Sequence, residues 1–324
     1  MLTDDLPRVS IAHLPTPLEE LPRLTALLEG PELWAKRDDL TGLATGGNKT
    51  RKLEFLVADA LDGRADTLVT CGAGQSNHAR QTAAAAAKFG LDCVLVLKGE
   101  LPEQVQGNLL IDQIVGARVV WAAAQALDAT MDSVASDLRT EGHRPYIVPY
   151  GGSNAVGASG YVAAMEELIQ QSEDRGLTFD HIVFPSSSGG TQAGLVVGAK
   201  ALGYTGCLLG ISVDPPAADL RRNLATLAPT LAARLQLDLH LDLHDFAVND
   251  GYVGDGYAVV SDLEREAIRT LGRTEGLLLD PVYTGRAFGA LLDLVRNRIF
   301  RKNERVLFWH TGGVAGLFGY AKRL

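Results

Sequence analysis

The sequence predicts an α/β protein made of two domains, each built on a mainly parallel sheet. The first observation is length, because 324 residues exceed the size at which a single hydrophobic core usually stops growing. The second is a repeated order of short apolar run, glycine-rich turn and helical pattern. Short β-rich runs that alternate with helical patterns indicate βαβ units, which form open, twisted parallel sheets with helices on both faces.

Seven apolar runs are expected to be strands: Thr67–Cys71, Cys93–Leu97, Arg118–Trp121, Tyr146–Pro149, His181–Pro185, Cys207–Val213 and Arg305–His310. Glycine-rich loops follow several of them, including GAGQSN, GGSNAVGASG, SSSGGTQAG and TGGVAGLFGY. Parallel sheets bind ligands in the loops beyond the carboxyl ends of their strands, so we expect these loops to form the site. The region 215–255 mixes a Leu/Ala-rich helical stretch with LDLHLDLHDF, whose alternation is strand-like.

Composition argues against several classes of function. The net charge of −9, without a long basic cluster, is not typical of a nucleic-acid-binding protein. No apolar run approaches the roughly 20 residues of a membrane span. The first residues, MLTDDLPRVS, lack the apolar core of a secretory signal, so a cytoplasmic protein is expected. His240 and His244 lie in the strand-like stretch, which would not present them as helix neighbours, so no metal site is predicted.

Lys49 is the first candidate for chemistry. It lies in GLATGGNKTRKLEFL, whose glycine spacing resembles that of a P-loop. The GK[ST] ending of a P-loop requires glycine immediately before lysine, but here Asn48 separates Gly47 from Lys49. A lysine at a helix N-terminus opposes the helix dipole, which lowers its pKa and favours the neutral amine that attacks aldehydes. The alternative is a solvated loop lysine.

A second loop, CGAGQSNHARQ, carries the consecutive polar residues Gln75, Ser76, Asn77 and His78. It lacks the third glycine of a dinucleotide-binding fingerprint, so NAD is poorly supported. One or two of these residues would be expected simply as helix caps. Four in a row exceed what capping needs, which favours a binding site.

A third loop, SSSGGTQAG, begins at Ser186 and combines hydroxyls with glycines at a predicted helix start. Such a loop forms an anion cradle that suits a phosphate monoester, although a plain helix cap is the alternative. Two further loops do not indicate a site by themselves and are candidates only because they accompany the other three. They are LDPVYTGRAF, with Tyr283 and Thr284, and WHTGG, with Thr311.

The motifs GGNKTRKLEFL, GAGQSNHARQTAA, GGSNAVGASGY, SSGGTQAGL, LDPVYTGRAF and HTGG, in this order, resemble the fold-type II pyridoxal 5′-phosphate (PLP) enzymes. The resemblance is to the group that contains D-cysteine desulfhydrase and 1-aminocyclopropane-1-carboxylate deaminase, and it covers nearly the whole chain. It implies a homodimer with a tryptophan-synthase-β-like fold. It also implies a large PLP-binding domain (residues 1–52 and 160–324) and a small inserted α/β domain (residues 53–159).

The resemblance also implies roles for individual residues. Lys49 would carry the cofactor and move the proton at Cα, with Ser76 beside the substrate as an alternative base or nucleophile. Tyr257 and Tyr283 match the two active-site tyrosines of the family, although GDGYAVV around Tyr257 departs from the usual glycine-proline version. The remaining contacts would be Asn77 to the cofactor 3′-oxygen, Gln75 to the substrate carboxylate, and Ser188, Gly189, Gly190 and Thr191 to the phosphate.

Three positions favour the desulfhydrase side of the family. Deaminases have a glutamate after the tyrosine, a leucine after the histidine and typically a glutamine after the QSN motif, whereas this chain has Thr284, Thr311 and His78. Thr284 would face the pyridine nitrogen of the cofactor, while His78 and Thr311 would lie near the substrate. The expected reaction is β-elimination from D-cysteine or a related β-substituted alanine, which belongs to D-amino acid catabolism.

Three alternatives stay open at this point. The first is aminocyclopropane-carboxylate deamination. The second is removal of sulfite from L-cysteate, which should call for an extra cation near Cβ, with Arg80 and Arg286 as the candidates adjacent to site loops. The third is a non-catalytic protein that binds PLP or an amino acid, against which the presence of Lys49, Ser76 and Tyr283 argues.

Overall fold

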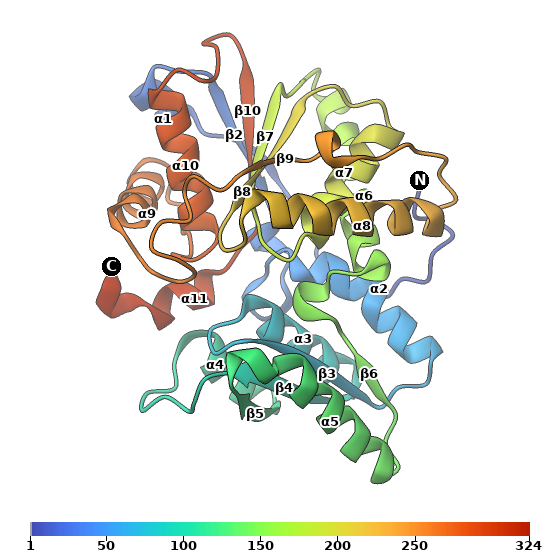
Figure 1. Ribbon diagram of the computed structural model, residues 1–324. Helices are drawn as coiled ribbons and strands as arrows, with labels where there is room; N and C mark the ends of the chain where they lie inside the picture. Colours follow the sequence, from blue (N-terminus) through green and yellow to red (C-terminus); the bar gives the residue numbers. More distant parts are fainter. Residues whose placement is uncertain (1) are drawn as a thin grey trace.

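Two mainly parallel sheets organise the protein, as the sequence predicts (Figure 1). The computed structural model describes residues 2–324. The larger sheet has the strand order β1-β2-β10-β7-β8-β9, and the smaller has the order β5-β4-β3-β6. The β1–β2 pair is antiparallel, and the other pairs of both sheets are parallel.

The strands of the larger sheet are β1 (Leu18–Glu20), β2 (Glu32–Arg37), β7 (His181–Ser186), β8 (Cys207–Ser212), β9 (Ala247–Asn249) and β10 (Arg305–His310). Those of the smaller sheet are β3 (Thr67–Ala73), β4 (Asp92–Lys98), β5 (Arg118–Ala122) and β6 (Pro145–Ile147). The helices are α1 (Pro22–Leu28), α2 (Lys49–Asp62), α3 (Asn77–Phe89), α4 (Gly107–Ile114), α5 (Leu127–Thr140), α6 (Ala155–Asp174), α7 (Gly190–Ala201), α8 (Ala217–Arg234), α9 (Asp262–Glu275), α10 (Thr284–Arg296) and α11 (Val314–Gly319).

The larger sheet is covered by helices on both faces, because its strands are apolar on both sides (Figure 1). In β10, Leu307 and Trp309 join the core cluster of α6, α7 and α8, whereas Val306 and Phe308 join that of α1, α9 and α10. This alternation is the two-residue period of a strand. The smaller sheet is built in the same way, with α2 and α3 on one face and α5 on the other.

All seven predicted strands are present, with ends that differ by at most two residues. The strand-like interpretation of LDLHLDLHDF is wrong, because residues 237–242 have no regular structure and Leu243–Asp245 form a short 3-10 helix, η5. The cause is a local cap: the Asp242 carboxylate accepts from the His244 amide, and the Asp245 carboxylate accepts from the Asp242 amide. Strands β1, β2 and β9 were not expected.

The strands of the smaller sheet lie within the predicted inserted domain, residues 53–159. Both predicted boundaries fall inside helices, since α2 crosses 52/53 and α6 crosses 159/160. These two helices pack against each other at a close approach, where a Cβ on Gly160 would lie 2.3 Å from the Arg51 carbonyl oxygen. The residue limits of the two domains therefore remain a prediction.

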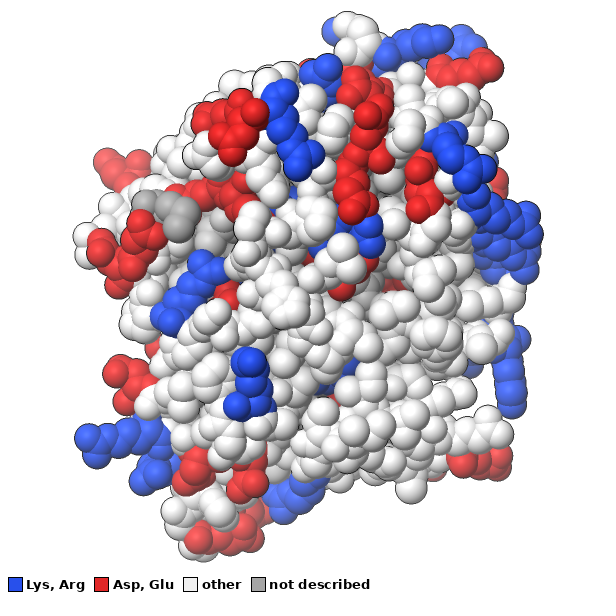
Figure 2. Space-filling model, turned by 180° about the vertical axis from the view of Figure 1, so that it is seen from behind, with Lys and Arg blue, Asp and Glu red and all other residues white. Residues whose placement is uncertain are grey.

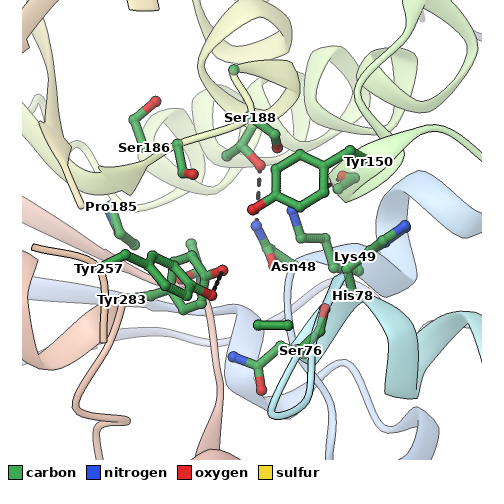
Figure 3. Close-up of a pocket in the computed structure, with 17 residues that line it drawn as sticks. Asn48, Lys49, Ser76, His78, Tyr150, Pro185, Ser186, Ser188, Tyr257 and Tyr283 are labelled. Carbon is green, nitrogen blue, oxygen red and sulfur yellow. Dashed lines mark hydrogen bonds between the residues drawn. The ribbon is translucent and has the colours of Figure 1, made fainter. Parts of the chain in front are cut away.

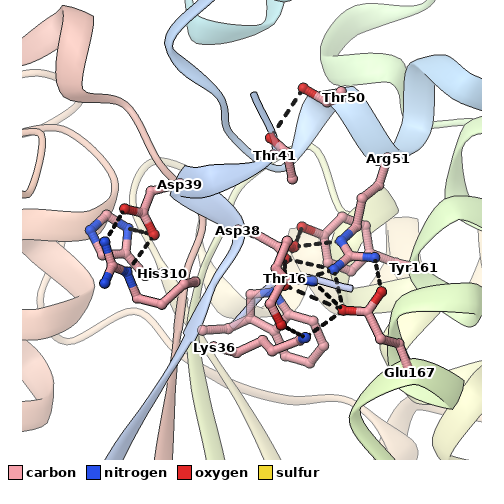
Figure 4. A network of polar contacts seen from close by, with 12 residues as sticks. Thr16, Lys36, Asp38, Asp39, Thr41, Thr50, Arg51, Tyr161, Glu167 and His310 are labelled. Carbon is pink, nitrogen blue, oxygen red and sulfur yellow. Dashed lines mark hydrogen bonds and ion pairs between the residues drawn. The ribbon is translucent and has the colours of Figure 1, made fainter. Parts of the chain in front are cut away.

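A buried ion network fixes the first turn of α2 to the larger sheet (Figure 4). Arg51 donates to Asp38 at 2.9 Å and to Glu167 at 2.8 Å, and Lys36 of β2 pairs with the same Glu167 carboxylate. Asp38 also accepts from the Tyr161 hydroxyl at 2.6 Å. Because each buried charge has an opposite partner and further hydrogen bonds, the network satisfies the condition under which buried ion pairs are tolerated. It holds the helix whose first residue is Lys49.

The molecular surface carries charges of both signs. On the face turned away in Figure 1, Lys, Arg, Asp and Glu lie around a broad, largely uncharged middle, and several Lys and Arg side chains gather along the upper right edge (Figure 2). In residues 2–324, no helix is both long and apolar enough to cross a bilayer.

Candidate active site

A pocket lies between the two sheets, beyond the carboxyl ends of β3, β6, β7 and β10 (Figure 3). This is the place at which open α/β sheets bind ligands. Ten of the predicted site residues line it: Lys49, Ser76, Asn77, His78, Ser188, Gly189, Thr191, Tyr257, Tyr283 and Thr311. The chain therefore brings residues from six segments, up to 262 positions apart in sequence (49 to 311), to one cavity.

Lys49 is the first residue of α2, as expected, and its amine points into the pocket (Figure 3). The Nζ atom donates to the Gly151 carbonyl oxygen at 3.1 Å. Burial lowers the pKa of this amine to about 8, so a substantial neutral fraction exists near physiological pH. The sequence-based expectation named the helix dipole as the cause, but desolvation is the largest one.

Lys52 stands one helical turn from Lys49 and is 1% exposed. Its Nζ lies 3.1 Å from the Gly151 carbonyl oxygen and 3.3 Å from Ser153 Oγ, and no carboxylate of residues 2–324 pairs with it. Burial and the adjacent Lys49 lower the pKa of Lys52 well below its usual value. A buried amine without a counter-charge is driven toward its neutral form, and a bound anion would supply the charge that restores the ammonium form.

The SSSGGTQAG loop lies directly beside Lys52. A Cβ atom on Gly190 would lie 2.8 Å from Lys52 Nζ and 2.6 Å from Ser153 Oγ, so only glycine leaves this space open. Ser153 Oγ accepts from the Gly190 amide at 3.1 Å and lies 2.8 Å from Ser188 Oγ. The helix α7 begins at Gly190, so hydroxyls, backbone amides, a helix N-terminus and an ammonium group converge on one small volume. A phosphate monoester fits this set of donors.

The polar run after β3 forms another wall. Ser76 caps α3, with its Oγ accepting from the Ala79 amide at 3.1 Å, which leaves the hydroxyl proton free to be donated. Asn77 is fixed by Asn108 of α4, whose Nδ2 donates to Asn77 Oδ1 at 2.9 Å. Helix α4 thereby sets the orientation of a side chain that faces the pocket.

His78 lines the pocket but bonds back to β3. Thr70 Oγ1 donates to the Val148 carbonyl oxygen at 2.8 Å, so it accepts from His78 Nε2 at 2.9 Å. Burial and the Lys49 and Lys52 ammonium groups lower the pKa of His78 well below its usual value. A neutral imidazole with its proton on Nε2 follows from this arrangement.

Two tyrosines close the opposite side. The hydroxyls of Tyr257 and Tyr283 are 2.7 Å apart, with the rings edge to face at 6.0 Å between centroids. Burial raises the pKa of both hydroxyls, so both remain protonated at neutral pH. They come from different segments, since Tyr257 lies in the loop before α9 and Tyr283 immediately precedes α10.

Three predicted residues are not among the lining residues: Gln75, Gly190 and Thr284. Gln75 uses its amide on α4, donating to the Gln106 carbonyl oxygen and accepting from the Asn108 amide. The Thr284 hydroxyl lies 2.8 Å from Asp280 Oδ1, beneath the start of α10. Gly190 is the first residue of α7, and its amide already bonds Ser153. Their predicted contacts with substrate or cofactor remain predictions.

The arginines considered for a sulfonate group do not line the pocket. Arg80 donates to the carbonyl oxygens of Ala44 and Gly46, in the segment before α2. Arg286 is 1% exposed and pairs with Glu264 at 2.7 Å. The Arg286 guanidinium is therefore committed to packing, whereas Arg80 uses Nη1 alone and keeps Nε and Nη2 without a hydrogen-bond partner among residues 2–324.

Sequence reasoning missed several lining residues, chiefly Asn48, Tyr150, Ser186 and Ser187, as well as the adjacent Lys52. Asn48 donates to Thr191 Oγ1 at 3.1 Å and so joins the lysine loop to the phosphate cradle. Asn48, Ser186 and Ser187 lie inside motifs that were already recognised, so their position beside assigned residues was an available signal. Tyr150 reaches the centre of the pocket in Figure 3, from a loop to which no site residue was assigned.

Comparison with known proteins shows the family to which this chain belongs. The model of a family described as pyridoxal-phosphate dependent enzyme matches residues 9–312. Curated proteins named D-cysteine desulfhydrase, from Salmonella typhi and from Salmonella newport (strain SL254), are 43% identical over 320 residues, which cover 97% of this chain and 96% of theirs.

Solved structures give the same result for the fold. The crystal structure of a protein described as an ACC deaminase homologue has a TM-score of 0.92 and 39% identity, covering 99% of this chain and 96% of that one. The crystal structure of a threonine deaminase from T.th. has a TM-score of 0.66 at 22% identity, covering 92% of each chain, which supports the shared fold alone.

Proposed function

Because this chain belongs to the pyridoxal-phosphate-dependent enzyme family, we propose that it is a lyase that converts D-cysteine, or a related β-substituted alanine, to pyruvate, ammonia and hydrogen sulfide. The relatives named D-cysteine desulfhydrase support this substrate. The observation that carries the proposal is a buried, low-pKa Lys49 amine beside the buried Lys52 amine, which has no carboxylate partner in residues 2–324, at the edge of one pocket.

The pocket suits pyridoxal phosphate at both ends. Lys52, Ser188 and the start of α7 (residues 189–191) would hold the phosphate, while Asn77 would bond the 3′-oxygen. A phosphate dianion beside Lys52 favours its charged form, and two ammonium groups in contact are unfavourable, so the neutral amine falls to Lys49. When bound, the cofactor acts as an electron sink that makes the Cα proton of an amino acid acidic.

Different residues of the chain would carry out the two proton transfers of the reaction, removal at Cα and donation to the leaving sulfur. The Lys49 amine, with a pKa of about 8, is suited to removing a proton from Cα. Ser76 Oγ lines the same pocket and is the alternative base. The hydroxyls of Tyr257 and Tyr283 are protonated and therefore can donate a proton to the sulfur that leaves Cβ.

The two other reactions receive less support. Removal of sulfite from L-cysteate should require a cation near Cβ, and no arginine is among the pocket-lining residues of the described chain. Opening of the aminocyclopropane ring is the more demanding reaction. The deaminases of the family that this chain resembles have a glutamate at the position of Thr284. The buried hydroxyl there, committed to Asp280, favours elimination of a good leaving group.

The first test compares three substrates on one preparation. D-cysteine is read as sulfide plus pyruvate, L-cysteate as sulfite, and 1-aminocyclopropane-1-carboxylate as 2-oxobutyrate. We expect sulfide to dominate, and the visible absorption band of lysine-bound cofactor to vanish in Lys49→Ala together with activity. Dominant 2-oxobutyrate would show that Thr284 and Thr311 do not decide the reaction. A wild-type protein without the absorption band would contradict the cofactor assignment.

The homodimeric state and the cytoplasmic location expected from the sequence are also proposals. The broad, largely uncharged area of the face in Figure 2 is compatible with burial against a second subunit. Light scattering on the purified protein distinguishes a particle of twice 34.5 kDa from a monomer.

A further inference from the structure

Tyr257 is carried by a segment that has little structure of its own. Residues 250–261, between β9 and α9, form neither helix nor strand. Gly254, Gly256 and Ala258 have positive φ angles of 60°, 124° and 62°. The left-handed conformation of Ala258 is unfavourable for a residue with a Cβ atom and persists only where surrounding contacts impose it. The position of the Tyr257 hydroxyl must therefore be set by other parts of the protein.

Arg286 supplies those contacts. Its Nη1 donates to the Gly256 carbonyl oxygen at 3.1 Å, and its Nη2 donates to the Val259 carbonyl oxygen at 2.8 Å, so the guanidinium group holds the backbone on both sides of Tyr257. Nη1 also donates to the Val213 carbonyl oxygen after β8, at 3.1 Å. This use of several donors from one plane requires the fork of an arginine.

Glu264 completes the arrangement from the first turn of α9. Its Oε1 accepts from Arg286 Nε at 2.7 Å, and its Oε2 accepts from the Ser261 amide at 2.7 Å and the Ser261 hydroxyl at 2.6 Å. Both charged side chains are 1% exposed. The carboxylate thus anchors the guanidinium and, through Ser261, the end of the loop.

The location of Arg286 connects this arrangement to the pocket. Arg286 lies three residues after Tyr283, on the first turn of α10. One helix start therefore carries Tyr283 and also the residue that holds the loop of its partner, Tyr257. We propose that the Arg286–Glu264 pair is a positioning device that keeps the Tyr257 hydroxyl at hydrogen-bond distance from Tyr283. A buried ion pair is a weak source of stability but a good determinant of geometry, which is consistent with this role.

The same two helices provide a matched control. Arg296 of α10 pairs with Glu266 of α9 at 2.6 Å, but these side chains are 47% and 52% exposed. Arg296→Lys removes an arginine fork between α10 and α9 without touching the Tyr257 loop. It should leave turnover unchanged.

The experiment is a double-mutant cycle on the holoenzyme with Arg286→Lys, Tyr257→Phe and their combination. The cycle rests on the proposed sulfide-releasing activity. We expect Arg286→Lys to lower kcat by roughly 10- to 100-fold, as misplacement of a site group by about 1 Å does. Because Arg286 acts through Tyr257, the double variant should be no slower than Tyr257→Phe alone. Losses that multiply, or a folded Arg286→Lys enzyme with wild-type kcat, would overturn the proposal.

A second measurement does not depend on activity. Amide hydrogen exchange in residues 253–260 should become faster in Arg286→Lys but not in Arg296→Lys, while exchange in β10 stays as in the wild type. Unchanged exchange in the loop would also overturn the proposal. If Arg286→Lys fails to fold, Glu264→Gln keeps the size of the side chain and weakens the same contacts. A wild type that releases no sulfide from D-cysteine contradicts the proposed function, whereas the exchange measurement still decides the positioning role.

Discussion

Lys52 is buried beside the pocket without a group of opposite charge in the described part of the chain to pair with it. The Lys52 side chain is 1% exposed and hydrogen-bonds the Gly151 carbonyl oxygen and Ser153 Oγ, but no carboxylate of residues 2–324 pairs with it, so its charged form is poorly compensated for the loss of water. A phosphate group would supply the missing charge. We expect Lys52→Gln to weaken binding of pyridoxal phosphate by roughly 10- to 100-fold, because a hydrogen bond to a charged group contributes about 1.5–3 kcal/mol.

Two comparisons separate this effect from a general loss of structure. Pyridoxal, which lacks the phosphate, should bind Lys52→Gln and the wild type with similar affinity. Lys200→Gln, which removes an exposed lysine of α7 paired with Asp245, should not change binding of either compound. Fluorescence titration measures each of these binding constants. An equal loss of affinity for both compounds would place the defect elsewhere than at the phosphate.

At the scale of elements, the depth at which α7 packs on α6 determines where the phosphate cradle lies. A Cβ atom on Gly194 would lie 2.4 Å from the Ala158 carbonyl oxygen and 2.5 Å from Tyr161 Cβ, distances that real Cβ contacts do not reach. Gly194→Ala must push the two helices apart. We expect a loss of about 1–3 kcal/mol of unfolding free energy, the usual range for overpacking, measured by urea denaturation.

Gly272 of α9 is the matched control, because it is also helical but a Cβ atom there would have its nearest neighbour, the Leu277 carbonyl oxygen, at 3.8 Å. Gly272→Ala should stabilise the protein by up to about 1 kcal/mol, the difference in helix propensity between glycine and alanine. Equal effects of the two substitutions would show that propensity alone, and not close helix packing, governs Gly194.

At the scale of the whole molecule, the strands of the two sheets are predicted from the sequence better than the residues that line the pocket. Strands such as β7 and β10 are recognisable because they are apolar on both faces and end at glycine loops. Strand β2 was missed because ELWAKR contains Lys36 and Arg37, whose burial depends on ion pairs with the distant residues Glu167 and Glu19 and, for Arg37, also with Asp39. Such compensation is invisible to a local pattern.

The same reason explains which site residues escaped prediction. Lys52 lies in KTRKLEFL, where a charged residue ordinarily marks the solvent face of a helix. Here α2 lies between the two sheets and buries Thr50 through Ala58 on all sides. Tyr150 follows β6 in a loop whose direction depends on how the two sheets are placed. Both residues reach the site through tertiary packing, whereas Lys49 and Ser76 are fixed by motifs that are local in sequence.

Asp112, a carboxyl group outside the pocket lining, should contribute to the pH dependence of stability. Asp112 of α4 is 1% exposed, and no group of residues 2–324 donates a hydrogen bond to either of its oxygens. Burial raises its pKa from 3.8 to about 7, although the Arg80 charge opposes this rise. The folded protein therefore binds more protons than the unfolded chain between about pH 4 and pH 7, and its free energy of unfolding falls as pH rises through this window.

Asp112→Asn removes this titration while preserving side-chain size. The variant should be more stable than the wild type above pH 7, with a difference that shrinks toward pH 4 by about 1.4 kcal/mol per pH unit. Urea midpoints of the cofactor-saturated proteins at several pH values measure the difference directly. Asp137→Asn, an exposed position on α5, should give no pH-dependent difference. If the advantage of Asp112→Asn does not grow with pH, the Asp112 carboxylate is already compensated when ionised, and the buried Arg80 guanidinium is then the group that must neutralise it.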